Sequence, residues 1–94
     1  MEKIKNPVLS VVIPSYNSEC YIRECLESLR TEKSDRVEYI FIDGGSTDNT
    51  MSIVEEYRDL FTVIISEKDK GQSDAFNKGF ALAQGEYLTW LNSD

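Results

Sequence analysis

Short apolar runs alternate with amphipathic stretches along the whole chain. Four runs rich in apolar, β-branched and aromatic residues predict strands, and they cover residues 9–13, 37–42, 62–65 and 87–91. Three stretches with apolar residues at helical spacing predict helices, and they cover residues 22–29, 53–61 and 75–83. This alternation with short connections predicts an open parallel sheet, right-handed crossovers and helices on both faces. The expected fold class is therefore α/β, in one unit that covers residues 1–94.

The connection after residues 37–42 is the most informative one. The apolar run ends at Asp43, turns on Gly44 and Gly45, and enters the next helix through residues 46–48, which are expected to cap that helix. In an open α/β sheet, ligands bind at the carboxyl ends of the strands, so Asp43 is expected at the position where a substrate would bind. An Asp in a turn also commonly accepts hydrogen bonds from nearby amides, here those of Gly44 and Gly45. Both interpretations of Asp43 stay open.

The first strand brings a second polar segment to the same edge of the sheet. It ends in Pro14, Ser15, Tyr16 and Asn17, which place an aromatic ring between small polar side chains. A flat ring there can stack on a nucleobase, or it can pack locally. Asn17 is expected to cap the helix that follows, since Asn is among the preferred N-cap residues.

A long charged loop over residues 67–73 precedes the third helix. Long loops in compact domains are more often functional than idle. Gly71 permits backbone torsions that other residues avoid, and the helix start near Ser73 and Asp74 offers free amides to an anion. Asp74 suits this position both as a ligand and as a helix cap.

The last three residues, 92–94, directly follow the fourth strand. One carboxylate, together with phosphate oxygens and water, is a common way to hold Mg²⁺ or Mn²⁺, and Asp94 supplies one. A terminal Asp is also commonly a solvent-exposed tail, so both interpretations of Asp94 stay open. Because the fourth strand ends at the ligand edge, we expect a truncated domain rather than a natural boundary.

Composition narrows the classes of function. With a net charge of −7 and no long basic run, the chain should repel nucleic acid, so no nucleic-acid partner is expected. An acidic protein still binds an anionic metabolite when a divalent cation lies between them. The sequence contains no histidine, which excludes Ser-His-Asp and Cys-His catalysis by these residues. Cys20 and Cys25 do not have CxxC spacing and are expected to be structural thiols.

The sequence carries no signal for membrane insertion or secretion. No apolar run approaches the roughly 20 residues of a membrane-spanning helix, and residues 1–7 lack the apolar core of a secretory signal. We therefore expect a cytoplasmic protein. Association with the inner face of the membrane is expected only through residues that this sequence does not contain.

Four segments resemble, in order and spacing, the motifs of family 2 glycosyltransferases, and they cover residues 12–17, 42–48, 71–79, and 85–87 with 91–94. Each motif alone is weak, but together they are specific and extend over nearly the whole chain. The resemblance implies the N-terminal, nucleotide-sugar-binding half of a GT-A fold, which is Rossmann-like. The members that look most similar are bacterial enzymes of surface-polysaccharide assembly.

The resemblance implies transfer of a sugar from a nucleotide-diphospho-sugar to a hydroxyl of a glycan or lipid-linked acceptor, with inversion of the anomeric configuration. A bound Mn²⁺ or Mg²⁺ would neutralise the charge that builds on the departing nucleoside diphosphate. Inversion needs a general base, which in this family lies beyond the position that corresponds to Asp94. We therefore expect the 94 residues alone to bind the donor at most and to be inactive.

The resemblance also implies roles for single residues. Pro14, Tyr16 and Asp43 would line the pocket for the base and the ribose. Asp94 would bind the metal as the last residue of the DxD motif. The full set of residues expected to bind the nucleotide-sugar is Pro14, Ser15, Tyr16, Asn17, Asp43, Gly44, Gly71, Asp74 and Asn92.

Two positions depart from the family's pattern. Gly44 stands where many members carry a second carboxylate, so only its backbone is available to a ligand. Asn92 replaces the first Asp of the DxD motif, which leaves the charge compensation of a metal to Asp94 and to residues outside this sequence.

Three alternatives compete with the transferase interpretation. A strand that ends in Asp before glycine and threonine resembles the nucleophile loop of haloacid-dehalogenase-like phosphatases, but the second carboxylate is missing and Asp43 ends the second strand. A receiver-like module needs paired acids after the first strand, and residues 14–16 supply none. A degenerate transferase domain that binds a nucleotide without catalysis is the third.

Overall fold

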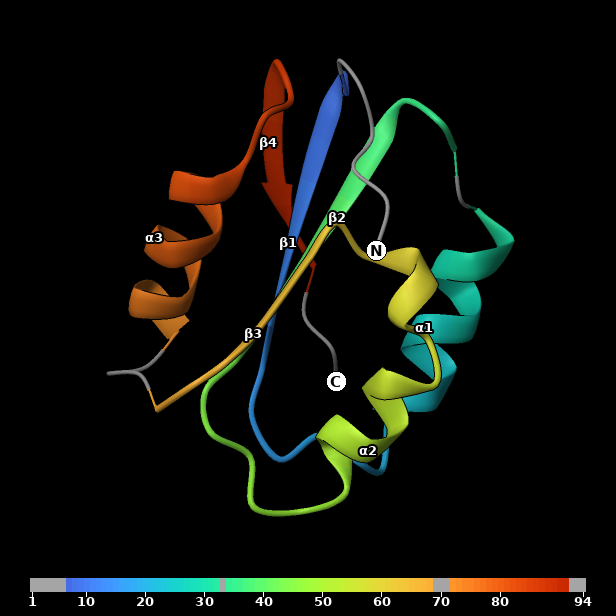
Figure 1. Ribbon diagram of the computed structural model, residues 1–94, viewed down its shortest axis with the longest axis vertical. Coiled ribbons are helices and arrows are strands. Elements are labelled where there is room, and N and C mark those ends of the chain that lie inside the picture. The colour runs from blue at the N-terminus through green and yellow to red at the C-terminus, as the bar shows by residue number, and fades with distance from the viewer. Residues whose placement is uncertain (1–6, 33, 69–71, 92–94) are drawn as a thin grey trace.

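The computed structural model describes residues 7–32, 34–68 and 72–91, and the side chains of residues 72–76 are outside this description. Within these residues, strands and helices alternate as the apolar pattern predicts (Figure 1). The elements are β1 Leu9–Ser15, α1 Ile22–Thr31, β2 Val37–Asp43, α2 Thr50–Glu55, the 3-10 helix η1 Arg58–Leu60, β3 Val63–Ser66, α3 Gln72–Leu82 and β4 Tyr87–Trp90.

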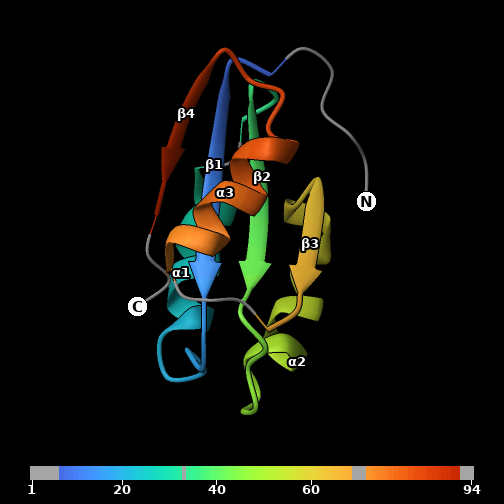
Figure 2. The ribbon, with the colours of Figure 1, turned by 90° about the vertical axis from the view of Figure 1, so that its left-hand side faces the viewer.

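The strands form one parallel sheet in the order β3-β2-β1-β4, which confirms the predicted fold class. The chain proceeds from β1 through β2 to β3 on one side and then returns to β4 on the other side of β1. All strand arrows point to the same end of the molecule (Figure 2). A reversal of strand order of this kind marks the place where open α/β sheets bind ligands, at the carboxyl ends of the strands.

Helices cover both faces of the sheet, as the sequence predicts. α1 and α2 lie on one face and α3 lies on the other (Figure 1). Neighbouring residues of a strand point to opposite faces, so Ile13 and Phe41 pack on the side of α1 and α2, whereas Val12 and Ile40 pack on the side of α3. Because both faces are covered, the central strands are continuous apolar runs rather than alternating ones.

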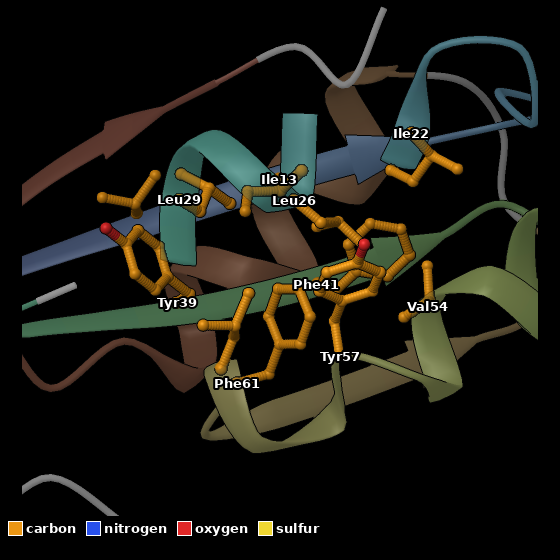
Figure 3. Close-up of a cluster of buried hydrophobic side chains, with 11 residues drawn as sticks. Ile13, Ile22, Leu26, Leu29, Tyr39, Phe41, Val54, Tyr57 and Phe61 are labelled. Carbon is orange, nitrogen blue, oxygen red and sulfur yellow. The ribbon is translucent and has the colours of Figure 1, made fainter. Parts of the chain in front are cut away.

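The larger hydrophobic core lies between the sheet and the pair α1 and α2 (Figure 3). At its centre the rings of Phe41 and Phe61 lie 5.5 Å apart and are inclined by 59°, a tilted arrangement that aromatic pairs favour. α1 contributes Ile22, Leu26 and Leu29, which are buried at the spacing of one helix face.

The second helix is shorter than predicted. The pattern over residues 53–61 predicts one helix, but α2 ends at Glu55 and the 3-10 helix η1 follows. A continuous α-helix would turn the adjacent Leu60 and Phe61 about 100° apart, so it would point only one of them squarely at the sheet. Instead, η1 ends at Leu60 and the backbone of Phe61 is already extended (φ −109°, ψ 143°). Both side chains are buried in this arrangement, and their packing overrides the helical pattern.

β4 forms one edge of the sheet and differs from the other strands in its exposure. Tyr87, Leu88 and Trp90 are each at least half exposed, whereas the neighbouring strand β1 is almost entirely buried. Among the described residues, no helix is long and apolar enough to cross a lipid bilayer.

Candidate functional site

Three polar strand ends lie side by side at the carboxyl edge of the sheet. The register pairs Ser15 of β1 with Asp43 of β2, and Asp43 with Ser66 of β3. The backbone extends this row, because the Gly44 amide donates to the Ser15 carbonyl at 2.8 Å and the Glu67 amide donates to the Asp43 carbonyl at 2.9 Å. The edge is therefore a continuous hydrogen-bonded rim.

The carboxylate of Asp43 is fully buried within this rim. Its Oδ2 accepts hydrogen bonds from the amides of Gly45 (3.1 Å) and Ser46 (2.8 Å) and from the hydroxyl of Ser66 (2.9 Å). Its Oδ1 accepts a further hydrogen bond from the Ser46 hydroxyl. Four bonds match the acceptor capacity of a carboxylate.

The turn interpretation of Asp43 is therefore confirmed in part. Its carboxylate accepts the Gly45 amide, whereas the Gly44 amide bonds to Ser15 instead. A buried carboxylate whose oxygens all accept internal hydrogen bonds is badly placed to attack phosphorus as a nucleophile, which argues against the phosphatase alternative.

Tyr16 stands out from this rim. Its side chain is 61% exposed, whereas Ser15 before it and Ser18 shortly after it are buried. Pro14, the residue that precedes Ser15, is buried in β1 opposite Ile42. The structure thus brings Pro14, Ser15 and Tyr16 to the same edge as Asp43, with only the aromatic ring directed to solvent.

The prediction that Asn17 caps the first helix is wrong. α1 begins at Ile22 after Tyr21, and no side chain caps it. The Ser18 carbonyl accepts the amides of Tyr21 (2.9 Å) and Ile22 (2.8 Å), so a backbone turn leads into the helix. The Asn17 side chain accepts the amide of Thr47 instead, at 2.8 Å. Propensity favours a cap on the nearby helix, but here the side chain of Asn17 makes its hydrogen bond with the loop between β2 and α2 instead.

The β1–α1 loop and the β2–α2 loop are joined along their length. The Asn17 amide donates to the Ser46 hydroxyl at 2.8 Å, and the Ser18 amide donates to the Thr50 hydroxyl at 2.8 Å. Further out, the Glu19 amide donates to Asp48 at 3.3 Å. The two loops, 29 to 32 residues apart in sequence, form one surface.

Residues 46–48 only partly confirm their predicted role as caps of the second helix. Asp48 accepts the amide of Thr50, the first residue of α2, at 2.9 Å. Burial raises the pKa of Asp48, but hydrogen bonds from Thr50 and from the Glu19 amide outweigh it and hold that pKa below its usual value. Ser46 and Thr47 serve the contact with the β1–α1 loop rather than the helix.

At Gly45, the connection between β3 and α3 lies close to this surface. The φ of Gly45 is +89°, where side chains are rarely accommodated, and a Cβ atom there would lie 3.3 Å from the backbone of Lys68. Lys68 belongs to the connection between β3 and α3. The same connection is tied to α3 by an ion pair between Glu67 and Lys78 at 2.9 Å.

Four of the predicted site residues are described little or not at all. α3 begins at Gln72, so Asp74 lies in its first turn, at the end of α3 that faces the strand tips (Figure 2), but its side chain is outside the described part. Gly71, Asn92 and Asp94 also lie outside the described residues. Within the described residues no cluster of carboxylates or cysteines could hold a metal ion.

Ser66 and Thr50 are site residues that the sequence interpretation missed. Ser66 ends β3 and supports Asp43, while Thr50 joins α2 to the first loop. For Ser66 a signal existed, because it is the last residue before the charged loop and the ends of parallel strands meet at one edge. Nothing local distinguishes Thr50 from an ordinary first-turn residue.

Residues 10–94 match the sequence model of a family described as Glycosyl transferase family 2. Among curated relatives, the "Putative glycosyltransferase EpsH" of Bacillus subtilis (strain 168) is 37% identical over 93 residues, which make up 97% of this chain and 27% of that protein. The chain thus spans about a quarter of that relative's length.

Solved structures of other proteins share the fold. S. aureus TarS 1–349 in complex with UDP-GlcNAc has a TM-score of 0.83 and 35% identity, over 93% of this chain and 26% of that one. The mannosyltransferase PcManGT from Pyrobaculum calidifontis, in complex with GDP-Man and Mn²⁺, has a TM-score of 0.81 and 28% identity, over 95% of this chain and 28% of that one. The expected GT-A fold is confirmed, and the match over residues 10–94 shows that the chain belongs to glycosyl transferase family 2.

Proposed function

We propose that this chain is the nucleotide-sugar-binding part of a glycosyltransferase that transfers a sugar from a nucleotide-diphospho-sugar to an acceptor hydroxyl. The observation that carries the proposal is the exposed ring of Tyr16 at the carboxyl end of β1, beside the point where the strand order reverses. An exposed aromatic ring at this edge offers a stacking surface to a base. The related TarS and PcManGT structures, which hold UDP-GlcNAc and GDP-Man, support a donor of this class.

The nucleobase would stack on Tyr16, and Pro14 and Ser15 would lie beneath it in the rim. Asp43 contributes by holding the wall of the pocket, since its carboxylate fixes the amides of Gly45 and Ser46. Gly44 offers only its backbone to a ligand. We assign Gly71, Asp74 and Asn92 to the same pocket, and Asn17 to its edge next to Tyr16.

The diphosphate of the donor needs positive charge nearby, because the chain carries a net charge of −7. We propose that Asp94 binds Mn²⁺ or Mg²⁺ for this purpose. The PcManGT complex contains Mn²⁺, which supports a divalent cation in a related protein. When bound, the ion supplies Lewis-acid stabilisation of the departing nucleoside diphosphate.

The rest of the reaction depends on parts of the protein that this sequence does not contain. We propose inversion at the anomeric carbon, with a general base beyond Asp94, and a glycan or lipid-linked acceptor in polysaccharide synthesis. We expect residues 1–94 alone to bind the donor without turnover. The proposed location is the cytoplasm, at the inner face of the membrane if other residues anchor the protein there.

The test is calorimetric titration of UDP, GDP and dTDP into the full-length protein, with and without Mn²⁺. Tyr16→Ala should raise the Kd of the preferred nucleotide by about 5- to 150-fold, which corresponds to the loss of one stacking contact. Tyr16→Phe should keep the affinity, because stacking needs only the ring. Tyr21→Ala removes a similarly exposed tyrosine nearby and serves as the control. Unchanged affinity in Tyr16→Ala would exclude the proposed base site, and tight binding without any sugar transfer would favour a degenerate domain.

A further inference from the structure

Asn17 has an unusual backbone conformation next to the exposed Tyr16. Its φ is 49°, and among the described residues it is the one residue other than glycine with a positive φ. Side chains disfavour this left-handed region, although Asn tolerates it better than most. Strained backbone of this kind persists only where the surrounding contacts hold it in place, and it is concentrated at functional sites.

The β2–α2 loop holds both the side chain and the backbone amide of Asn17. Its side-chain Oδ1 accepts the Thr47 amide at 2.8 Å, and its own amide donates to the Ser46 hydroxyl at 2.8 Å. Ser46 in turn donates its hydroxyl and its amide to the buried carboxylate of Asp43. A short chain of hydrogen bonds therefore runs from Asn17 through Ser46 into the centre of the rim.

The left-handed turn at Asn17 sets the direction of the residues on either side. After the turn, Ser18 is buried and its amide donates to the Thr50 hydroxyl at 2.8 Å. The Ser18 hydroxyl also lies 3.3 Å from that of Ser15 and 3.4 Å from the Tyr16 carbonyl. These hydrogen bonds hold the backbone of the β1–α1 loop on both sides of Tyr16, while the Tyr16 side chain stays exposed to solvent.

We propose that Asn17 is a positioning residue, which locks the β1–α1 loop onto the β2–α2 loop and so presents Tyr16 in a fixed orientation for the nucleobase. The side-chain oxygen of Asn17 already accepts the Thr47 amide, so its effect on the ligand passes through Tyr16 rather than through direct contact. Fixing the ring before binding removes an ordering cost from the binding step. This inference rests on the proposed function.

The test combines Asn17 variants with the Tyr16 variant in the full-length protein. The probe is whichever of UDP, GDP and dTDP the unmodified protein binds. Asn17→Gly keeps the left-handed backbone but deletes the acceptor of the Thr47 amide, and it should raise the Kd by about threefold to tenfold. Asn17→Ala should raise it further, because alanine also resists the left-handed conformation.

The decisive comparison is the same substitution in a Tyr16→Ala background. If Asn17 acts by positioning Tyr16, Asn17→Gly changes the Kd there by less than about twofold, because the residue it positions is absent. A loss of affinity as large as in the unmodified background would overturn the proposal, since Asn17 would then act independently of Tyr16. A merely structural role would weaken binding equally in both backgrounds.

Hydrogen exchange gives a second readout without ligand. Asn17→Gly should speed exchange of the Thr47 amide, whereas Asn17→Asp, which keeps an oxygen at the same place, should restore its protection. Asn49→Ala in the facing loop removes only an exposed contact with Glu19 and serves as the matched control. Equal Kd values for the unmodified protein and Asn17→Gly would refute the positioning role and leave the proposed function standing. Absence of nucleotide binding by the unmodified, folded protein would instead refute the proposed function on which it rests.

Discussion

Ser10 donates a hydrogen bond of 2.6 Å to Glu38, although 28 residues separate them and both side chains are buried. Glu38 also accepts the Gln84 amide at 2.6 Å and the Thr62 hydroxyl at 3.1 Å. The Ser10 hydroxyl accepts the Gly85 amide at 2.8 Å in the same place. A single carboxylate thus joins β1, β2, the residue before β3 and the turn before β4, at the end of the sheet opposite the site.

Removing this carboxylate should destabilise the fold. Glu38→Ala leaves the Ser10 hydroxyl, the Thr62 hydroxyl and the Gln84 amide without their acceptor, and we expect a loss of about 2–4 kcal/mol in the free energy of unfolding. Urea denaturation followed by circular dichroism measures it. Glu24→Ala on the exposed face of α1 is the control, for which about 0.5 kcal/mol or less is expected. Equal midpoints for the two variants would show that the network contributes little.

The packing of α3 on the sheet predicts a coupled pair of substitutions. A Cβ atom on Gly79 would lie 2.4 Å from a methyl carbon of Val12, closer than real contacts allow. We expect Gly79→Ala to cost about 1–3 kcal/mol of stability, as overpacking commonly does. In a Val12→Ala background the same change should cost at least about 1 kcal/mol less, because the clashing methyl groups are gone. A double-mutant cycle from urea midpoints measures the coupling, and strictly additive costs would contradict this contact.

Asp48 predicts an acid-sensitive contact between the two loops of the site. Hydrogen bonds hold the pKa of Asp48 below its usual value of 3.8 in the folded protein, so its stabilising contribution is present above that value and is lost as the pH falls below it. Asp48→Asn should therefore lower stability at pH 6 and flatten the decline of stability between pH 4 and pH 2. Thermal melts across this range test it. The same steep acid decline in both proteins would assign it to other carboxylates.

The contacts of Tyr57 predict a contribution to folding stability that disappears at alkaline pH. The Tyr57 hydroxyl donates to Glu27 and accepts from Arg23. The guanidinium groups of Arg23 and Arg30 lie 5.9 Å and 5.3 Å from the centroid of the Tyr57 ring. The hydrogen bond to Glu27, with burial, raises the pKa of Tyr57 above its usual 10.0. Its contribution is thus present below pH 10.0 and is lost as the pH rises through the raised pKa.

Tyr57→Phe should lower the urea midpoint at pH 7, and the difference from the unmodified protein should shrink toward pH 11. Tyr39→Phe is the control for alkaline effects elsewhere, because burial and, to a smaller extent, the charge of Glu32 raise the pKa of Tyr39 as well. A difference for Tyr57→Phe that stays constant with pH would show that the hydroxyl does not hold the helices together.

The order of the elements and the α/β class follow from the sequence because their cause is local. The apolar run that ends at Asp43 predicts a strand, and the two glycines after it predict the turn that β2 makes at the edge of the sheet. Placement of Asp43 and Tyr16 at the same edge also follows, because parallel strands end together.

The tertiary structure alone decides what those residues contact. Local propensity favours a helix cap at Asn17, but a loop 30 residues away supplies the amide that its side chain binds. The same holds for Glu38, whose partners are spread from Ser10 to Gln84, and for the early end of α2, where packing of Leu60 and Phe61 overrides the helical pattern. Periodicity and propensity act between near neighbours in sequence, whereas these hydrogen bonds and packing contacts form only after distant segments have been brought together by the sheet.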